Sequence, residues 1–113
     1  MASMKRYSAK LLFRFRVGKR FTQETRETCE GRIIVFRARS NREALQRAKQ
    51  RGKREEFQYR NAEGGIVYFE FVGVLDLVSL ENLCKEDEVW YGIKEISRKR
   101  QIVPSDELLL KRT

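Results

Sequence analysis

The chain has no histidine, one proline and two cysteines among its 113 residues. Without histidine, catalysis by a serine or cysteine paired with an imidazole is excluded, and so is zinc bound by histidine. Cys29 and Cys84 lie far apart and in no CxxC pattern, so we expect free thiols rather than a disulfide framework or a metal site. We therefore expect no enzyme activity, no cofactor, no metal and no small-molecule substrate.

Long hydrophobic runs are also missing, and none approaches the roughly 18 residues of a membrane-spanning helix. The first residues contain no hydrophobic segment of the kind found in signal peptides. Hydrophobic residues make up 41% of the chain and charged residues 36%, which suits a modest core with an ionic surface. We expect one cytoplasmic domain over residues 1–113, with a core at about 7–96, a tail at 97–113 and no membrane contact.

The charge of the chain is strongly asymmetric. Residues 1–60 carry 18 Lys and Arg against 6 Asp and Glu, whereas residues 61–113 carry 7 against 10. The formal net charge is +9. Such a split in a small chain favours a polyanionic or acidic partner.

Strand patterns dominate the sequence. Apolar and polar positions alternate through residues 7–17, as in a half-buried strand. β-branched and aromatic runs predict further strands at 32–39, 57–61, 66–78 and 88–96. In the segment 66–78, one alternating set should face one side of the sheet: Val67, Phe69, Phe71, Gly73 and Leu75. Residues 18–31 are polar and are predicted to form a long loop, and residues 79–87 a turn region.

A single main helix is predicted at about 40–52. Ser40 and Glu43 form a capping box, and Gly52 is expected to end the helix as its C-cap. A narrow stripe of Ala44, Leu45 and Ala48 would let this helix lie close to a sheet. A short helix is expected at 106–110, with Ser105 as its N-cap.

The order β-β-α-β-β-β with a C-terminal tail predicts an α+β fold. Its mostly antiparallel sheet would have about five strands, and the main helix would pack on one face. The opposite face would stay open.

Several segments together resemble a known family. They are Tyr7 to Phe13, Ile33 to Ala38, Glu43-Ala44-Leu45 with Ala48, Asn61, and Phe69 to Leu77. In this order and spacing they are similar to the bacterial domain-of-unknown-function family numbered 4288, over roughly residues 7–93. The resemblance implies a small cytoplasmic bacterial protein, and it implies no activity or catalytic residue.

The open sheet face is the first candidate binding site. If the strands 7–17 and 32–39 are neighbours, cations and apolar side chains alternate there: Lys10, Leu12, Arg14, Arg16, Ile33, Val35, Arg37, Arg39 and Tyr68. Arginine planes and aromatic rings suit a nucleic acid, whose phosphates and bases they can contact. Exposed Leu12, Ile33 and Val35 suit a protein partner or a homodimer. A solvated face that binds nothing is the third possibility.

The main helix is the second candidate site because it is strongly basic. Its cations are Arg42, Arg47, Lys49, Arg51, Lys53 and Arg54. They could follow a phosphate backbone, although a surface helix of this kind is often only solvated. The preferred function is a non-enzymatic module that binds a protein or itself, and the alternative is a nucleic-acid-binding module with little sequence readout.

Overall fold

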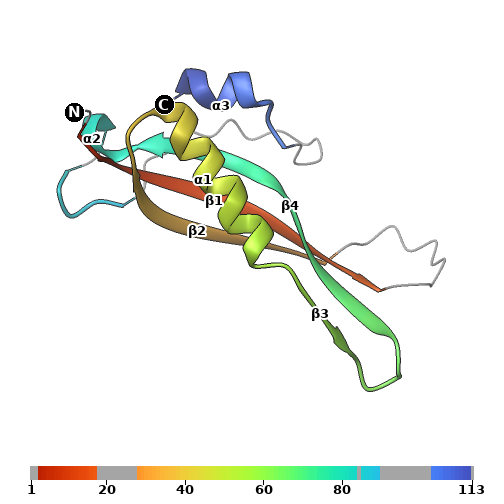
Figure 1. Ribbon diagram of the computed structural model, residues 1–113. Helices are drawn as coiled ribbons and strands as arrows, with labels where there is room; N and C mark the ends of the chain where they lie inside the picture. The colour runs from red at the N-terminus through yellow and green to blue at the C-terminus, as the bar shows by residue number, and fades with distance from the viewer. Residues whose placement is uncertain (1–2, 18–27, 84, 90–102, 113) are drawn as a thin grey trace.

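The computed structural model describes residues 3–17, 28–83, 85–89 and 103–112. Four strands form one antiparallel sheet in the order β2-β1-β4-β3. They are β1 (Lys5–Val17), β2 (Thr28–Ala38), β3 (Phe57–Arg60) and β4 (Ile66–Ser79). Helix α1 (Asn41–Arg54) crosses one side of the sheet, which we call the helix face (Figure 1). The opposite side is called the far face. The predicted α+β architecture with one main helix is confirmed.

Two short helices complete the described fold. Helix α2 (Leu80–Leu83) directly follows β4, where the sequence predicts only a turn region. Helix α3 (Asp106–Arg112) lies beside α1 (Figure 1). The Ser105 hydroxyl accepts a hydrogen bond from the Leu108 amide at 3.2 Å, so the predicted N-cap is confirmed. Leu109 is 1% exposed, and it joins the core from a segment that the sequence analysis left in the tail.

The core lies between α1 and the two central strands. Tyr7, Ala9, Leu11 and Phe13 of β1 alternate onto the helix face and are buried. The predicted stripe of α1 packs against them, with Ala44 and Ala48 fully buried and Leu45 5% exposed. Because the side chains of this stripe are small, the helix can approach the sheet closely. The hydroxyl of Tyr7 donates to Asn41 Oδ1 at 2.8 Å and ties the start of α1 to β1.

Gly52 lies inside α1, so the prediction that it ends the helix is wrong. The helix continues to Arg54, and Glu55 is its C-cap. A Cβ at position 52 would lie 2.3 Å from Cδ1 of Phe71 in β4, well inside van der Waals contact. The glycine is therefore explained by close packing of the helix on an aromatic ring, not by backbone conformation.

Two irregularities in the β1–β4 pairing change which residues of β4 share a face. The single step from Lys10 to Leu11 in β1 matches the two steps from Asp76 to Val74 in β4. The single step from Leu12 to Phe13 likewise matches the two steps from Gly73 to Phe71. The extra residues are typical of β-bulges, which bend a strand and increase its twist. Gly73 consequently lies opposite Leu12, while Val74 is buried. The expected common face of Phe71, Gly73 and Leu75 is wrong for this reason.

The sheet has four strands in the described residues, not about five. Glu88 and Val89 are not part of a strand, and the rest of the predicted strand 88–96 lies outside the described residues. Strand β2 begins at Thr28, so the end of the predicted loop 18–31 belongs to the sheet. Residues 18–27 lie outside the described residues. Residues 28–31 are the first part of β2 and pair with β1, where Thr28 lies opposite Phe15.

Candidate functional site

The strand register brings most of the predicted binding face together on the far face. Residues directly opposite each other in an antiparallel pair share a face. Lys10 lies opposite Ile33 and Arg16 lies opposite Tyr68. Eight of the nine predicted residues therefore lie on the far face: Lys10, Leu12, Arg14, Arg16, Ile33, Val35, Arg37 and Tyr68. Arg39 does not, because β2 ends at Ala38 and Arg39 lies in the bend before α1.

Part of the far face is covered. Ser8 and Val78 pair on this face, yet they are only 0% and 3% exposed. The Ser8 hydroxyl donates a hydrogen bond to the carbonyl of Val89, so residues that follow α2 return over this end of the sheet. Gly73 is also covered, since a Cβ there would lie 2.7 Å from Cγ1 of Val103. The exposed part of the face therefore lies along β2 and at the end of β1 that carries Arg14 and Arg16.

The cations at the other end of the far face are already engaged. Glu70 accepts a hydrogen bond from Arg16 Nε at 2.8 Å, and Arg14 Nε lies 3.4 Å from the same carboxylate. The hydrogen bond from Arg16 holds the pKa of Glu70 below its ordinary value, and the charge of Arg14 adds to this effect. Arg16 also lies over the Tyr68 ring, 4.5 Å from its centroid. The two guanidinium groups share one carboxylate, so Glu70 balances only part of the positive charge at this end of the face. Arg14 Nε has no hydrogen-bond partner among the described residues.

Replacing Glu70 by glutamine is expected to make stability less dependent on pH. A carboxylate with a lowered folded-state pKa stabilises the fold above its unfolded pKa of about 4.3, and this contribution disappears as the pH falls through the folded value. Glu70→Gln should therefore lower the free energy of unfolding at pH 7 by up to about 1 kcal/mol. The difference from the unmodified chain should shrink below about pH 4. Urea denaturation across this pH range measures it.

Glu63→Gln is the matched control, because Glu63 is an exposed carboxylate in the turn between β3 and β4. It should change stability little at any pH. A difference between Glu70→Gln and the unmodified chain that stays constant from pH 7 to pH 3 would show that the charge of Glu70 does not stabilise the fold.

The most exposed apolar residues of the predicted binding face lie on β2, which is one of the two edge strands. Ile33 is 53% exposed and Val35 is 48% exposed. They alternate in the middle of β2, which pairs with β1 on one side and with no described strand on the other. Near the end of β2, Arg47 Nη1 donates to the carbonyl of Arg37 at 2.9 Å. The carbonyl of Arg37 is therefore occupied. The rest of this edge of β2 pairs with no described strand, and an edge of this kind can accept another strand.

A groove runs between α1 and β2 on the helix face. Half-buried Ile34 and Phe36 lie at its floor, and its volume is about 800 Å³. At one end Arg47 contacts the Arg37 carbonyl. At the other end Arg32 Nη1 lies 3.6 Å from Glu55 Oε2. The groove is therefore bounded at both ends by contacts between the helix segment and β2.

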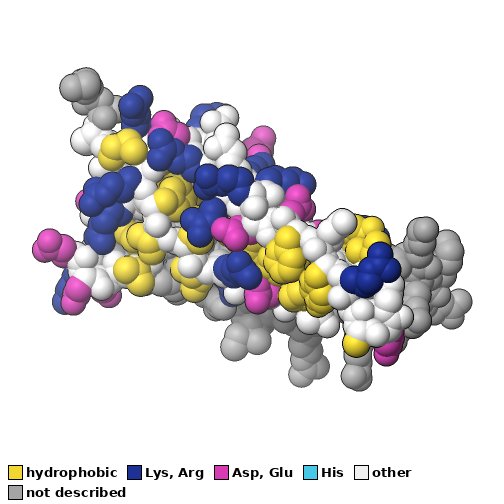
Figure 2. All heavy atoms as spheres, turned by 60° about the horizontal axis from the view of Figure 1, so that its bottom comes forward, with side chains coloured by type: hydrophobic (Ala, Val, Ile, Leu, Met, Phe, Trp, Pro, Cys, Tyr) yellow, Lys and Arg dark blue, Asp and Glu magenta, His cyan; other side chains and the backbone are white. Residues whose placement is uncertain are grey.

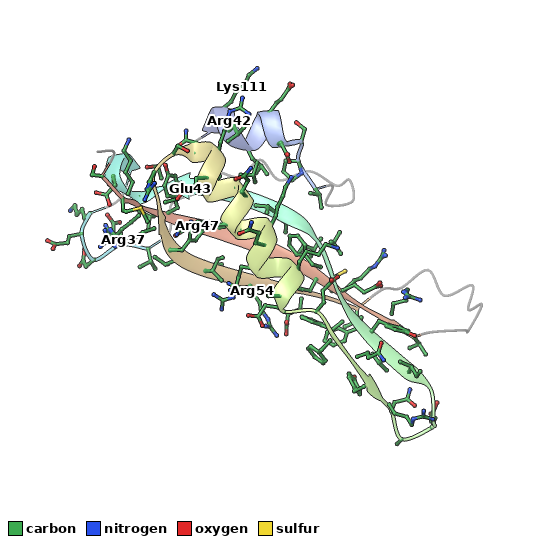
Figure 3. The ribbon with its side chains drawn as sticks, viewed as in Figure 1. Arg37, Arg42, Glu43, Arg47, Arg54 and Lys111 are labelled. Carbon is green, nitrogen blue, oxygen red and sulfur yellow. The ribbon has the colours of Figure 1, made fainter. Side chains whose placement is uncertain are left out.

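The predicted basic helix lines this groove with five of its six cations: Arg47, Lys49, Arg51, Lys53 and Arg54. The sixth, Arg42, lies on the flank toward α3, as Figure 3 shows. Exposed ion pairs hold several of them, including Arg47 with Glu43 at 3.1 Å and Arg51 with Glu55 at 2.8 Å. In the space-filling view, Lys and Arg side chains are interspersed with hydrophobic ones over this side of the molecule (Figure 2). Exposed ion pairs such as Arg47 with Glu43 are only weakly stabilising, so these arginines can exchange their partners for another carboxylate.

Arg32 also contributes to the helix face, although it is not among the predicted site residues. Its guanidinium lies 5.3 Å from the ring centroid of Phe13 and 5.0 Å from that of Phe69. It also pairs with Glu30 at 2.7 Å. The signal was present, since Arg32 has the same parity as Ile34 and must share the helix face. Because Arg32 is charged, the sequence did not indicate that its side chain lies over the rings of Phe13 and Phe69 at the end of the core.

No group of three or more Cys, Asp or Glu side chains in the described residues could hold a metal ion. Among the described helices, none is long and apolar enough to cross a membrane. A family model described as domain of unknown function (DUF4288) matches residues 6–91, more than half of the chain.

The chain belongs to the DUF4288 family. The predicted resemblance is confirmed, and the matched range spans β1 to β4 together with α1 and α2. Neither a curated protein nor a solved structure matches the chain. The description of the DUF4288 family assigns no activity, so the function has to be argued from the residues themselves.

Proposed function

We propose that the protein is a non-enzymatic module of the bacterial cytoplasm that binds a protein partner along β2. The observation that carries the proposal is the exposure of Ile33 and Val35 in the middle of an outer strand. Single exposed apolar residues are common on protein surfaces. Two of them on an eleven-residue edge strand are different, because such an edge is a template for pairing with another chain.

The far face supports this function better than nucleic-acid binding. Arg14 and Arg16 share the carboxylate of Glu70, and the ring of Tyr68 is covered by Arg16. Phosphates and bases would have to displace these contacts. Ile33 and Val35, in contrast, need no rearrangement before a partner covers them.

Nucleic acid is the second candidate, and a specific feature favours it. Phe57 and Tyr59 of β3 are 51% and 46% exposed, with ring centroids 6.2 Å apart. Exposed aromatic rings on a sheet can stack with unpaired bases, and neighbouring cations can contact the phosphates. Binding of this kind would weaken steeply as the salt concentration rises.

Replacing Ile33 by lysine is expected to remove partner binding. Burying an unpaired ammonium group in an apolar contact is costly, so the affinity should fall at least about tenfold. The unmodified chain is used to isolate its partner from cells, and the partner is then identified and purified. Isothermal titration of the purified pair measures the loss.

Leu108→Lys is the matched control, because Leu108 is a 50% exposed apolar residue on α3. It should leave the affinity unchanged. Light scattering of the isolated chain tests for a homodimer, and anisotropy with labelled single-stranded and duplex nucleic acids across a salt series tests the second candidate. Unchanged affinity of Ile33→Lys, or nucleic-acid binding at physiological salt that depends on Phe57 and Tyr59, would overturn the proposal.

A further inference from the structure

We propose that the partner segment is an acidic, extended strand that adds to the edge of β2 and places alternate side chains in the groove beside α1. This inference rests on the proposed function and names the chemistry of the partner. It joins two features that lie on opposite sides of β2. They are the groove above Ile34 and Phe36 and the exposed pair Ile33 and Val35.

Strand geometry connects these two features. A strand added to β2 would lie about 4.8 Å from it, and its side chains would alternate between the two faces of the sheet. One set would enter the groove beside Ile34 and Phe36. The other set would lie next to Ile33 and Val35 on the far face. Recognition through main-chain hydrogen bonds and alternating side chains is a general way in which sheets bind extended peptides.

Charge identifies the partner as acidic. Helix α1 and strand β2 together carry eight Lys and Arg residues against Glu30 and Glu43. Carboxylates of the partner that point into the groove would meet Arg54 on its helical wall. They would also compete with Glu43 for Arg47 and with Glu55 for Arg51, in exposed ion pairs that are weak enough to exchange. Arginine binds carboxylates through two parallel hydrogen bonds. An acidic strand would therefore gain both backbone pairing and charge-assisted contacts.

The same charges disfavour a second copy of this chain. Pairing of two β2 edges would bring two α1 helices with their arginines toward the same boundary, and like charges placed close together oppose association. The partner strand should instead carry acidic residues on one side and apolar residues on the other. The apolar set would match Ile33 and Val35.

The test uses a fluorescein-labelled peptide of eleven residues, the length of β2, in which glutamate and valine alternate. Fluorescence anisotropy with the full chain measures its affinity. We expect binding, and we expect Arg54→Glu to weaken it about tenfold. Arg42→Glu is the matched control, because Arg42 is an exposed cation of the same helix on the flank away from the groove (Figure 3). It should change the affinity less than about threefold.

Backbone methylation tests strand addition directly. In a β-strand, alternate N–H groups point to the same side, so only one alternate set can pair with β2. N-methylation of one set, either the glutamates or the valines, should abolish binding, while methylation of the other set should not. Equal effects of the two methylations, or equal binding of a lysine–valine peptide, would overturn the inference. Tighter Arg54-dependent binding of oligothymidylate than of the peptide would also overturn it and assign the groove to nucleic acid.

The outcomes separate this inference from the proposed function. If the glutamate–valine peptide does not bind while Ile33→Lys still loses the isolated partner, only the acidic strand is wrong. If Ile33→Lys keeps its partner, the proposed use of β2 is wrong as well.

Discussion

Replacing Phe13 by alanine is expected to lower the free energy of unfolding by about 3–5 kcal/mol. Phe13 is fully buried at the centre of β1. Its ring stacks on Phe69 with centroids 4.6 Å apart and meets Phe71 at 5.6 Å. The substitution removes the buried ring and its contacts with Phe69 and Phe71. It leaves a cavity that the surrounding residues cannot fill completely. Urea denaturation followed by circular dichroism measures the loss.

Phe57→Ala is the matched control for this prediction. Phe57 also contacts Phe69, with centroids 4.9 Å apart, but it is 51% exposed. Truncating this exposed side chain creates no buried cavity, so the loss in the free energy of unfolding should be much smaller. Similar losses at positions 13 and 57 would show that the centre of the aromatic cluster does not lie at Phe13.

Replacing Gly52 by alanine is expected to destabilise the protein by about 1–3 kcal/mol, the usual cost of forcing an extra group into a packed site. On an exposed helix the same change would be favourable, because alanine is a better helix former than glycine by about 1 kcal/mol. The sign is reversed here because the added Cβ would meet the Phe71 ring at 2.3–2.6 Å. The midpoint of urea unfolding reports the sign as well as the size of the effect.

Two further variants make this result specific. Gln50→Ala changes an exposed residue of the same helix and should leave stability nearly unchanged. Phe71→Leu removes the opposing ring, so Gly52→Ala should cost less in that background than in the unmodified chain. An increase in stability for Gly52→Ala alone would rule out the close contact between α1 and β4.

Local sequence patterns predicted those elements whose signal lies within a few residues. The alternation in β1, the Ser40 N-cap of α1 and the small-residue stripe are all present in the structure. Of the predicted capping box, Ser40 accepts from the Glu43 amide, while the Glu43 carboxylate accepts from the Arg39 amide. Gly52 was misassigned because a glycine near a helix end has two physical explanations, a left-handed cap and a close approach. Only the position of Phe71, which comes from a distant strand, distinguishes them. The bulges in β4 could not be predicted for the same reason, since they are defined by its pairing with β1.

The sequence predicted which residues share the far face, but not which of them are engaged by neighbouring side chains or lie on an edge strand. Parity placed Arg14, Arg16 and Tyr68 on one face correctly. It could not show that Glu70 already occupies both arginines. Nor could it show that Ile33 and Val35 belong to an outer strand, because strand order is determined by pairings across the whole sheet. The groove beside α1 was invisible for a similar reason, since it forms between two elements.

The irregular pairing of β4 affects how relatives of this chain should be aligned. Val67, Phe69 and Phe71 share a parity, Val74 has the other, and Leu77 returns to the first, although all of them pair with residues on the helix face of β1. The first irregularity reverses the alternation and the second restores it. A relative that lacks two residues here, one at each irregularity, would therefore present the same side chains to the helix. A relative that lacks only one would have every residue on one side of the gap turned over, unless a compensating insertion follows.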